Sequence, residues 1–282
     1  MDFSIITPSF KQLDWLELCA ASIADQRGVT LEHIVQDGGS GPSIEDWRNR
    51  RPSIQVIVEA DSGMYDAVNK GLERANGAFC AYLNCDEQYL PDALTRVAQY
   101  FSDNPEIDIV FADAIVVSGS GEYMCQRQTL VPNALHTATC HLNTFTCSTF
   151  FRRSIVDRKL LFDPALRDLG DAKWILTLIK EGLRMGHLPV FTTAFTDTGD
   201  NMNTRPNAHR EAMLVRKNAG IVARILRPVT AWHHRLRRLR AGYYRPDKLN
   251  YAIYTKDSPS QRQTFRVENP TFIWPKRLKA FQ

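Results

Sequence analysis

Two acidic residues follow an apolar run within the first hundred residues of the chain. Residues 78–87 read Ala-Phe-Cys-Ala-Tyr-Leu-Asn-Cys-Asp-Glu, so the run ends in Asp86 and Glu87. In open α/β sheets, ligands bind at the carboxyl ends of the strands. Carboxylate oxygens are hard ligands that suit Mg²⁺ or Mn²⁺, and such a cation suits a diphosphate. The segment therefore predicts a strand end that binds a metal ion and a nucleotide.

The surrounding residues alternate between strand and helix patterns. The apolar runs predict strands at 3–7, 31–36, 54–58, 78–83 and 107–112. The intervening segments predict helices at 14–24, 64–75 and 91–101. Strands separated by helices pair in parallel with right-handed crossovers, so the loops that follow them meet at one edge of the sheet. We expect an α/β fold with a mostly parallel central sheet flanked by helices.

The second half of the chain is less regular. Residues 114–165 predict strands and loops without a clear order. A helix is expected at 171–182, a strand at 190–195, and helices at 208–226 and from there to Arg240, separated by Pro228. Residues 243–282 give no clear pattern.

The composition is that of a globular protein. Of the 282 residues, 44% are hydrophobic and 23% are charged. No run reaches the roughly 18 apolar residues of a membrane span, and the N-terminus does not resemble a signal peptide, so we expect a cytoplasmic protein. Six cysteines without a CxxC pair predict reduced thiols and no cysteine zinc site. We expect His141, His187 and His209 to be surface or hydrogen-bonded residues rather than metal ligands.

Positive charge is concentrated late in the chain. Residues 205–248 hold 12 Lys/Arg and two acids, a net +10, against 23 Lys/Arg and 29 acids, a net −6, elsewhere. Within 221–240, apolar residues recur at helical spacing among arginines: Ile221, Ile225, Val229, Trp232, Leu236 and Leu239 among Arg224, Arg227, Arg235, Arg237, Arg238 and Arg240. This pattern is typical of an interfacial helix on anionic lipid, which would place the protein peripherally on the inner face of the cell membrane. The alternative is a helix that packs on the body of the protein or in a homo-oligomer.

Five motifs in this order resemble the family 2 glycosyltransferases, which have the GT-A fold. They are Ser-Ile-Ile-Thr-Pro-Ser-Phe (4–10), Ile-Val-Gln-Asp-Gly-Gly-Ser (34–40), Glu-Ala-Asp-Ser-Gly-Met-Tyr-Asp-Ala-Val-Asn-Lys-Gly (59–71), Tyr-Leu-Asn-Cys-Asp-Glu (82–87) and Leu-Pro-Asp-Ala-Leu (90–94). The similarity spans residues 3–115 and continues more weakly to about 200, and it looks nearest to bacterial enzymes of surface-polysaccharide assembly. It implies a GT-A catalytic domain at 1–204, with a nucleotide-binding half at 1–115 and an acceptor half at 116–204. A basic helical C-terminal extension follows at 205–282.

The resemblance assigns roles to individual residues on the nucleotide side. It implies that Thr7, Pro8 and Ser9 line the nucleotide. Asp37 would accept a hydrogen bond from the uracil N3–H, and Asp61 would hold the base or ribose. The structural alternative for Asp37 is an Asx-turn, and for Asp61 it is a turn or helix cap.

The family's metal-binding DxD element reads Asn84-Cys85-Asp86 in this chain, so an amide replaces its first acid. The resemblance implies that Asp86 binds Mn²⁺ or Mg²⁺. It also implies that Asn84 and Cys85 lie against the nucleotide-sugar. Glu87 is expected either to reach the metal or to face solvent.

The resemblance also implies an inverting reaction that needs a catalytic base. In the family this base stands at the start of a helix after a segment that here reads Phe-Asp-Pro-Ala-Leu-Arg-Asp-Leu-Gly-Asp-Ala-Lys-Trp (162–174). Asp171 aligns best with that position, and Asp168 is its rival. The structural alternative for Asp171 is a helix N-cap.

The resulting hypothesis is a metal-dependent, inverting glycosyltransferase. We expect it to move a sugar from a UDP-sugar to a hydroxyl of a saccharide acceptor on a lipid carrier, in surface-polysaccharide synthesis. One alternative, suggested by Asn84, is a nucleotide-sugar-binding module without activity. Another is a nucleic-acid-binding protein that uses the +10 segment, although this leaves the acidic loops unexplained. We therefore expect no nucleic-acid partner.

Overall fold

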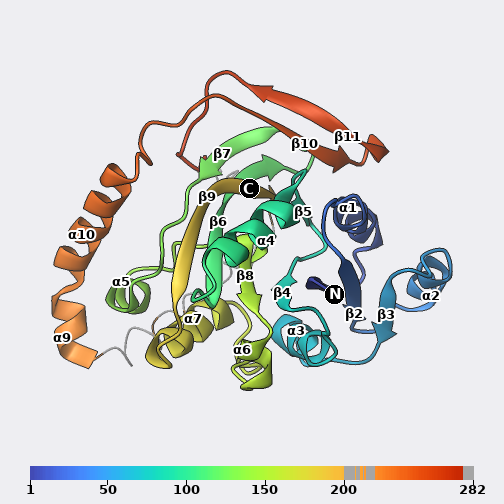
Figure 1. Cartoon of the computed structure of the whole chain (residues 1–282), viewed down its shortest axis with the longest axis horizontal. Coiled ribbons are helices and arrows are strands. Elements are labelled where there is room, and N and C mark those ends of the chain that lie inside the picture. Colours follow the sequence, from blue (N-terminus) through green and yellow to red (C-terminus); the bar gives the residue numbers. More distant parts are fainter. Residues whose placement is uncertain (200–206, 208–209, 212, 214–219, 276–282) are drawn as a thin grey trace, which may run out of the picture.

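A computed structural model describes residues 1–199, 207, 210–211, 213 and 220–275. Its centre is a nine-stranded sheet in the order β3-β2-β1-β4-β8-β6-β9-β5, with β7 paired to β6 (Figure 1). The strands are β1 (Phe3–Ser9), β2 (Leu31–Asp37), β3 (Gln55–Val58), β4 (Phe79–Tyr82), β5 (Glu87–Tyr89), β6 (Ile109–Ser118), β7 (Tyr123–Arg127), β8 (Thr149–Arg152) and β9 (Met185–Asp197). Strands β3, β2, β1 and β4 are parallel, and β8 runs antiparallel between β4 and β6.

Helices cover both faces of this sheet. The helices are α1 (Leu13–Ala24), α2 (Pro42–Asn49), α3 (Met64–Glu73), α4 (Ala93–Asp103), α5 (Ala134–Thr139), α6 (Ser154–Asp157), α7 (Gly170–Lys180), α9 (Gly220–Ile225) and α10 (Arg227–Arg240), with a 3-10 turn η1 (Thr146–Ser148). Side chains of α3, α6 and α7 pack on one face, and those of α1 and α4 on the other. Successive side chains of β1 point to opposite faces of the sheet. Ile6 packs with α3, α6 and α7 on one face, while Phe3 and Ile5 pack with α1 and α4 on the other. The predicted α/β class is confirmed.

Several elements differ from the sequence prediction. Helix α2 and strand β5 were not predicted. Strand β6 extends to Ser118 rather than ending at residue 112, and its residues from Ile109 to Val117 are all buried. Asp113 interrupts its apolar pattern. The Asp113 carboxylate can be buried because it has polar partners. It accepts a hydrogen bond from the Thr129 N–H, at 2.8 Å, and pairs with His187 Nε2 at 2.9 Å.

The helical description of 205–282 needs correction. Residues 249–267 form an antiparallel hairpin of β10 (Leu249–Thr255) and β11 (Ser258–Val267). Tyr251, Ile253 and Val267 of the hairpin pack in a cluster with side chains of β6 and β9, so this segment completes part of the core. Helix α10 does form as predicted, with Pro228 in its first turn. The helix predicted at 208–226 lies partly outside the described residues.

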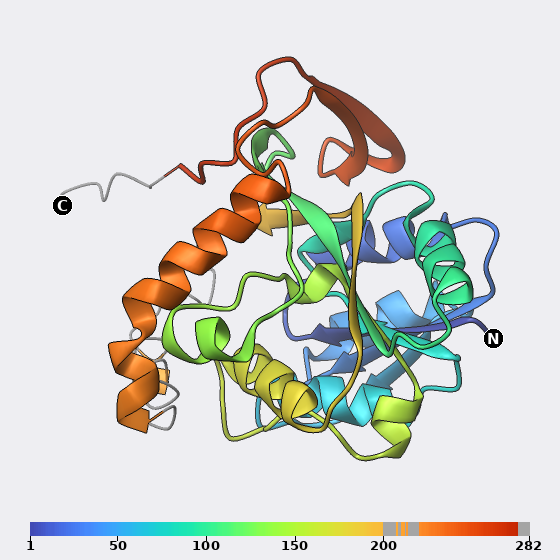
Figure 2. The ribbon, with the colours of Figure 1, turned by 60° about the vertical axis from the view of Figure 1, so that its left-hand side comes forward.

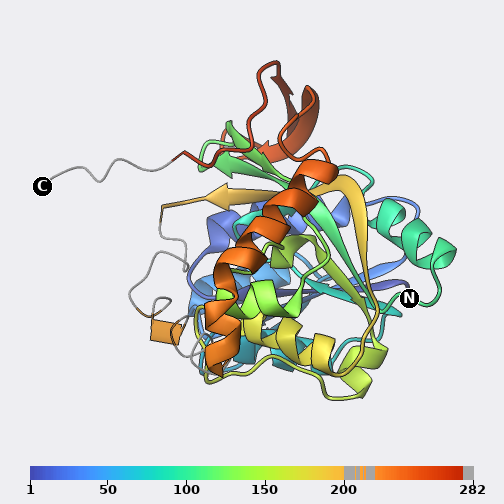
Figure 3. The ribbon, with the colours of Figure 1, turned by 90° about the vertical axis from the view of Figure 1, so that its left-hand side faces the viewer.

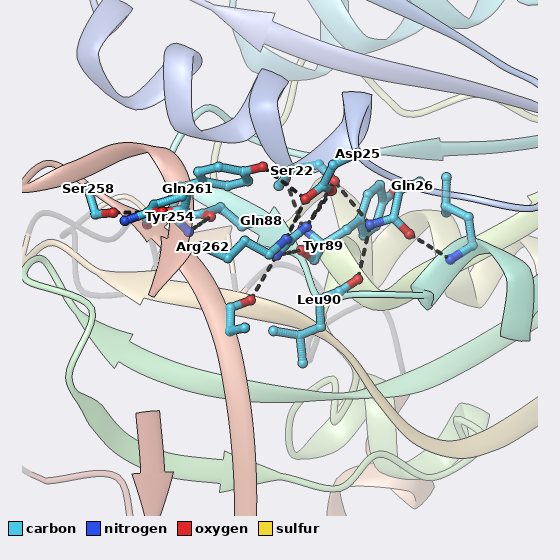
Figure 4. Close-up of polar contacts among 12 residues, drawn as sticks. Ser22, Asp25, Gln26, Gln88, Tyr89, Leu90, Tyr254, Ser258, Gln261 and Arg262 are labelled. Atoms are coloured by element: carbon cyan, nitrogen blue, oxygen red, sulfur yellow. Dashed lines mark hydrogen bonds and ion pairs between the residues drawn. The ribbon is translucent and has the colours of Figure 1, made fainter. Parts of the chain in front are cut away.

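A partly buried arginine attaches the hairpin to the C-terminal end of α1, as Figure 4 shows. The Arg262 guanidinium donates to both carboxylate oxygens of Asp25, at 2.6 and 2.7 Å, and to the backbone carbonyls of Tyr89 and Ala252, at 2.9 and 2.8 Å. Beside it, the Gln88 side chain exchanges two hydrogen bonds with the Tyr254 backbone, at 2.8 and 2.9 Å. One side chain therefore joins α1, β5 and β10.

We expect Arg262→Ala to lower the free energy of unfolding by about 2–4 kcal/mol, since Asp25 loses its charged partner and keeps the Tyr254 hydroxyl, while two carbonyls lose the guanidinium. Urea denaturation of the variant and the parent measures the loss. Lys248→Ala is the matched control, because Lys248 and its partner Glu268 are exposed, and removing that pair should cost less than about 1 kcal/mol. Equal effects in the two variants would show that Arg262 is not an anchor.

Candidate active site

A cleft of about 870 Å³ opens where the loops after β1, β3 and β4 meet. Pro8, Ser9 and Phe10 line it from the end of β1, Asp61 and Gly63 from the loop after β3, and Asn84 to Glu87 from the segment between β4 and β5. Residues of the segment before α7 and of 137–146 complete its wall. The cleft therefore lies at the carboxyl ends of the parallel strands, where the sequence placed it.

Most of the predicted site residues meet in this cleft, but two do not line it. Pro8, Ser9, Asp61, Asn84, Cys85, Asp86, Glu87, Asp168 and Asp171 are all lining residues. Thr7 and Asp37 are fully buried below the surface of the cleft. The Thr7 hydroxyl lies 2.9 Å from His33 Nε2, inside the sheet layer.

Asp37 holds the shape of the loop after β2. Its carboxylate accepts hydrogen bonds from the backbone N–H groups of Gly39 and Ser40, at 2.9 and 2.7 Å, and from the Ser40 hydroxyl at 2.7 Å. These are the contacts of the Asx-turn alternative. The loop lies against the cleft, since the Gly38 N–H donates to the Ser9 carbonyl, and a Cβ on Gly38 would lie 2.6 Å from Asp61 Oδ2.

The segment after β4 brings two carboxylates to the cleft with different surroundings. Asp86 is half-buried, and burial raises its pKa. Glu87 is only 1% exposed, and its carboxylate accepts a hydrogen bond from the Asn84 backbone N–H at 2.8 Å. Burial, and then the charge of Asp86, raise the pKa of Glu87. Glu87 therefore does not face solvent, which corrects one of the two alternatives for it.

These residues fit a divalent cation. Asp86 and Glu87 are adjacent acids, and burial raises the pKa of both, with the Asp86 charge adding to the effect on Glu87, so a bound cation would stabilise their ionised forms. The Asn84 side chain adds an amide oxygen in the same cleft. Hard oxygen donors of this kind bind Mg²⁺ or Mn²⁺ with the help of substrate phosphates.

The two candidate bases stand around the first turn of α7. The Asp171 N–H donates to the Tyr65 hydroxyl at 3.2 Å, and Asp171 Oδ1 accepts from the Ala172 N–H at 2.7 Å. Burial is the main cause that raises the pKa of Asp171 to about 6. Asp171 lies inside the helix, whose N-cap is Leu169, so it is not the N-cap of the alternative interpretation.

The hydrogen-bond partners of Asp168 differ from those of Asp171. Asp168 Oδ2 accepts a hydrogen bond from Asn207 Nδ2 at 2.7 Å, and only 8% of the residue is exposed. Glu211 lies beside it and accepts from the backbone N–H groups of residues 167, 168 and 169, at 2.8–3.0 Å. Glu211, which the sequence analysis did not select, thus fixes the loop that leads into α7.

An aromatic group at the cleft also escaped the sequence analysis. Phe145, Phe195 and Trp274 line the cleft together, with Trp274 stacked on Phe145 at a ring-centroid distance of 6.2 Å and edge-on to Phe195 at 5.7 Å. Trp274 Nε1 donates to Asp197 at 2.9 Å. Apolar faces of this kind suit the C–H face of a sugar ring, but the three residues come from segments whose meeting no local pattern indicates.

Known proteins resemble this chain in sequence. The family model described as "Glycosyl transferase family 2" matches residues 4–158. A "PGL/p-HBAD biosynthesis glycosyltransferase" of Mycobacterium tuberculosis is 26% identical over 260 residues, which cover 83% of this chain and 98% of that protein. The "Uncharacterized glycosyltransferase EpsJ" of Bacillus subtilis is 26% identical over 205 residues, covering 64% of this chain and 57% of that protein.

Solved structures resemble it in fold. TarS of S. aureus, crystallised with UDP-GlcNAc, superimposes with a TM-score of 0.58 at 18% identity, over 76% of this chain and 65% of that one. The mannosyltransferase PcManGT of Pyrobaculum calidifontis, in complex with GDP-Man and Mn²⁺, gives a TM-score of 0.51 at 15% identity, over 86% and 81% of the two chains. The family model matches more than half of the residues of the present chain. The chain therefore belongs to glycosyl transferase family 2 and is a glycosyltransferase with a GT-A-like fold.

Proposed function

We propose that the protein is an inverting, metal-dependent hexosyltransferase that moves a sugar from a UDP-sugar to a hydroxyl of a saccharide acceptor. The observation that carries this proposal is that Asp86 and Asp171, from different elements, line one cleft together with Ser9 and Asp61. The UDP-GlcNAc in TarS and the GDP-Man and Mn²⁺ in PcManGT support a nucleotide-sugar donor with a divalent cation. A dTDP-sugar presents the same base N3–H and is the nearest alternative donor.

Each residue has a role in this proposal. Pro8, Ser9 and Asp61 hold the nucleoside, and Thr7 and Asp37 support them from below by fixing the ends of β1 and β2. Asp86, with Asn84 and Glu87 beside it, would hold Mn²⁺ or Mg²⁺, and a bound cation stabilises the negative charge of the leaving diphosphate. Asp171 removes the proton from the acceptor hydroxyl as that oxygen attacks the anomeric carbon.

Asp171→Asn should lower kcat at least 100-fold while UDP binding stays within twofold, because the amide keeps the shape but accepts no proton. In the parent, kcat/KM should rise tenfold per pH unit below about 6 and level off above it, since the base must be ionised and its pKa is about 6. Donor-to-acceptor transfer measured between pH 4.5 and 8 gives this profile. A larger loss in Asp168→Asn than in Asp171→Asn would move the assignment to Asp168.

Removing the Asp86 carboxylate should abolish metal-dependent nucleotide binding. We expect Asp86→Ala to weaken UDP binding at least tenfold in the presence of Mn²⁺ and to leave the weak binding in EDTA unchanged, as titration calorimetry can show. Asp46→Ala, an exposed acid on α2, is the control. Full activity in Asp86→Ala would contradict the metal assignment. Tight UDP binding without turnover on any donor and acceptor would favour the nucleotide-sugar-binding module instead.

We further propose that the acceptor is a saccharide on a lipid carrier and that the protein works at a membrane surface. The names of two relatives refer to PGL/p-HBAD biosynthesis and to teichuronic acid biosynthesis. No helix in the described part of the chain is long and apolar enough to cross a bilayer. Helices α9 and α10 instead run along the outside of the molecule (Figure 3). Their apolar side chains include Ile221, Ile225, Val229, Trp232 and Leu239, each 61–70% exposed.

These side chains lie among exposed arginines, and residues 212–246 contain no acid. Anionic lipid therefore attracts this surface, and the apolar side chains can enter the interface. Leu236, Arg237 and Arg238 are half-buried and belong to the side of α10 that packs on the protein.

The double variant Ile225→Ser/Trp232→Ser should bind vesicles at least tenfold more weakly, because each removed side chain contributes roughly 1.5–3 kcal/mol when buried. Co-sedimentation with phosphatidylcholine vesicles, with and without phosphatidylglycerol, measures the effect. Val58→Ser changes an exposed apolar residue at the far edge of the sheet and should have no effect. A vesicle affinity that changes neither with phosphatidylglycerol nor in the double variant would show that α9 and α10 do not contact lipid.

A further inference from the structure

Three histidines from two parts of the chain meet at the rim of the cleft. His136 belongs to α5, His141 follows that helix, and His234 belongs to α10, which packs against α5 (Figure 2). One ring nitrogen from each lies within 4.8 Å of the others. His136 and His234 are 3% and 5% exposed, while His141 is exposed and lines the cleft. The group is therefore buried on one side and open to the cleft on the other.

The two buried histidines lack expected partners. Their rings stack with centroids 3.8 Å apart, and in the described part of the chain Nδ1 of each is buried without a hydrogen bond. Buried polar atoms in proteins are nearly always paired with protein or with a bound group. An unpaired imidazole nitrogen in a group of three histidines is a candidate ligand for a bound metal ion.

Three arginines, Arg127, Arg237 and Arg238, lie near the three rings. Arg237 donates to the Val131 carbonyl at 2.7 Å, and Arg238 lies over the Tyr243 ring, so these two charges have other partners.

We propose that His136, His141 and His234 form a binding site for a divalent transition metal of the Zn²⁺ type, which fastens α10 to α5. Imidazole ligands favour Zn²⁺, Co²⁺, Ni²⁺ and Cu²⁺ over the Mg²⁺ or Mn²⁺ expected at Asp86, so the two sites have different chemistry. Three protein ligands leave a fourth tetrahedral position. His141 and Arg127 both line the cleft, so a fourth ligand can enter from the cleft, and the Arg127 charge favours an anion such as hydroxide or phosphate.

The geometry needs only side-chain movement. Zinc–nitrogen bonds of about 2.0–2.1 Å place the nitrogens of a tetrahedral site roughly 3.3 Å apart. The three nitrogens therefore draw together by up to about 1.5 Å, and the stacked pair tilts apart by rotation of the imidazoles. The exposed position of His141 leaves it free to make this adjustment.

Titration of the tag-free full-length protein with Co²⁺, followed by its visible d–d absorption, tests the site. We expect one Co²⁺ per chain, displaced by one Zn²⁺, with a tetrahedral spectrum. His141→Ala should weaken binding by more than about 100-fold, beyond the range for a lost outer-sphere partner. His233→Ala, an exposed histidine adjacent to His234, is the matched control and should bind as the parent does.

His141 is exposed, so its replacement opens no cavity, and the far-UV spectrum of the variant should match that of the parent. Zn²⁺ should also raise the Tm of the parent and of His233→Ala but not of His141→Ala, because the metal binds only the folded arrangement. Absence of stoichiometric binding, or binding that persists in both His141→Ala and His234→Ala, overturns the proposal. An equal loss of metal affinity in His233→Ala also overturns it.

Discussion

The parallel pairing of β1 with β2 on one side and β4 on the other is the constraint on which the rest of the site depends. Its register sets Ser9 opposite Asp37 and Ile6 opposite Tyr82, so the chain leaves all three strands at the same edge. Close packing holds this register, since a Cβ on Gly77 would lie 2.5 Å from the Phe3 backbone and one on Gly71 would lie 2.5 Å from the Ile6 side chain. The Cys85 thiol then donates to the Pro8 carbonyl at 3.3 Å and joins the loops at the cleft itself.

Around this edge the protein keeps carboxylates in a partly dehydrated environment. Asp61, Asp86 and Asp171 come from three different segments, and burial is the largest cause of the raised pKa of each. Burial disfavours an ionised carboxylate, and a bound cation or a proton offsets that cost, which is typical of functional sites. Asp37 is also buried, and it accepts hydrogen bonds within its own loop. These bonds hold the shape of the edge.

The sequence predicted the parts of the fold that local patterns encode. Strands β1 to β4, helices α1, α3 and α4, and the loops between them follow from apolar periodicity and from Gly and Pro positions. Strand β5 is only three residues long and pairs with β9, so its existence depends on a contact more than a hundred residues away. The β10–β11 hairpin likewise has exposed polar residues along β11 and a buried side that only its partners β6 and β9 reveal. Trp274 and the trio His136, His141 and His234 were missed for the same reason, because their significance arises from residues distant in the chain.

The attachment of the hairpin by Arg262 has a consequence for the order in which the molecule is made. Asp25 directly follows α1, and its partner Arg262 is synthesised 237 residues later. Until then, Ile115, Val117 and Ala194 of β6 and β9 lack the hairpin side chains that pack on them, and Trp274 is absent from the cleft wall. Contacts of such long sequence separation form slowly. The segment from β10 to Trp274 therefore both covers apolar side chains of the sheet and completes the wall of the cleft.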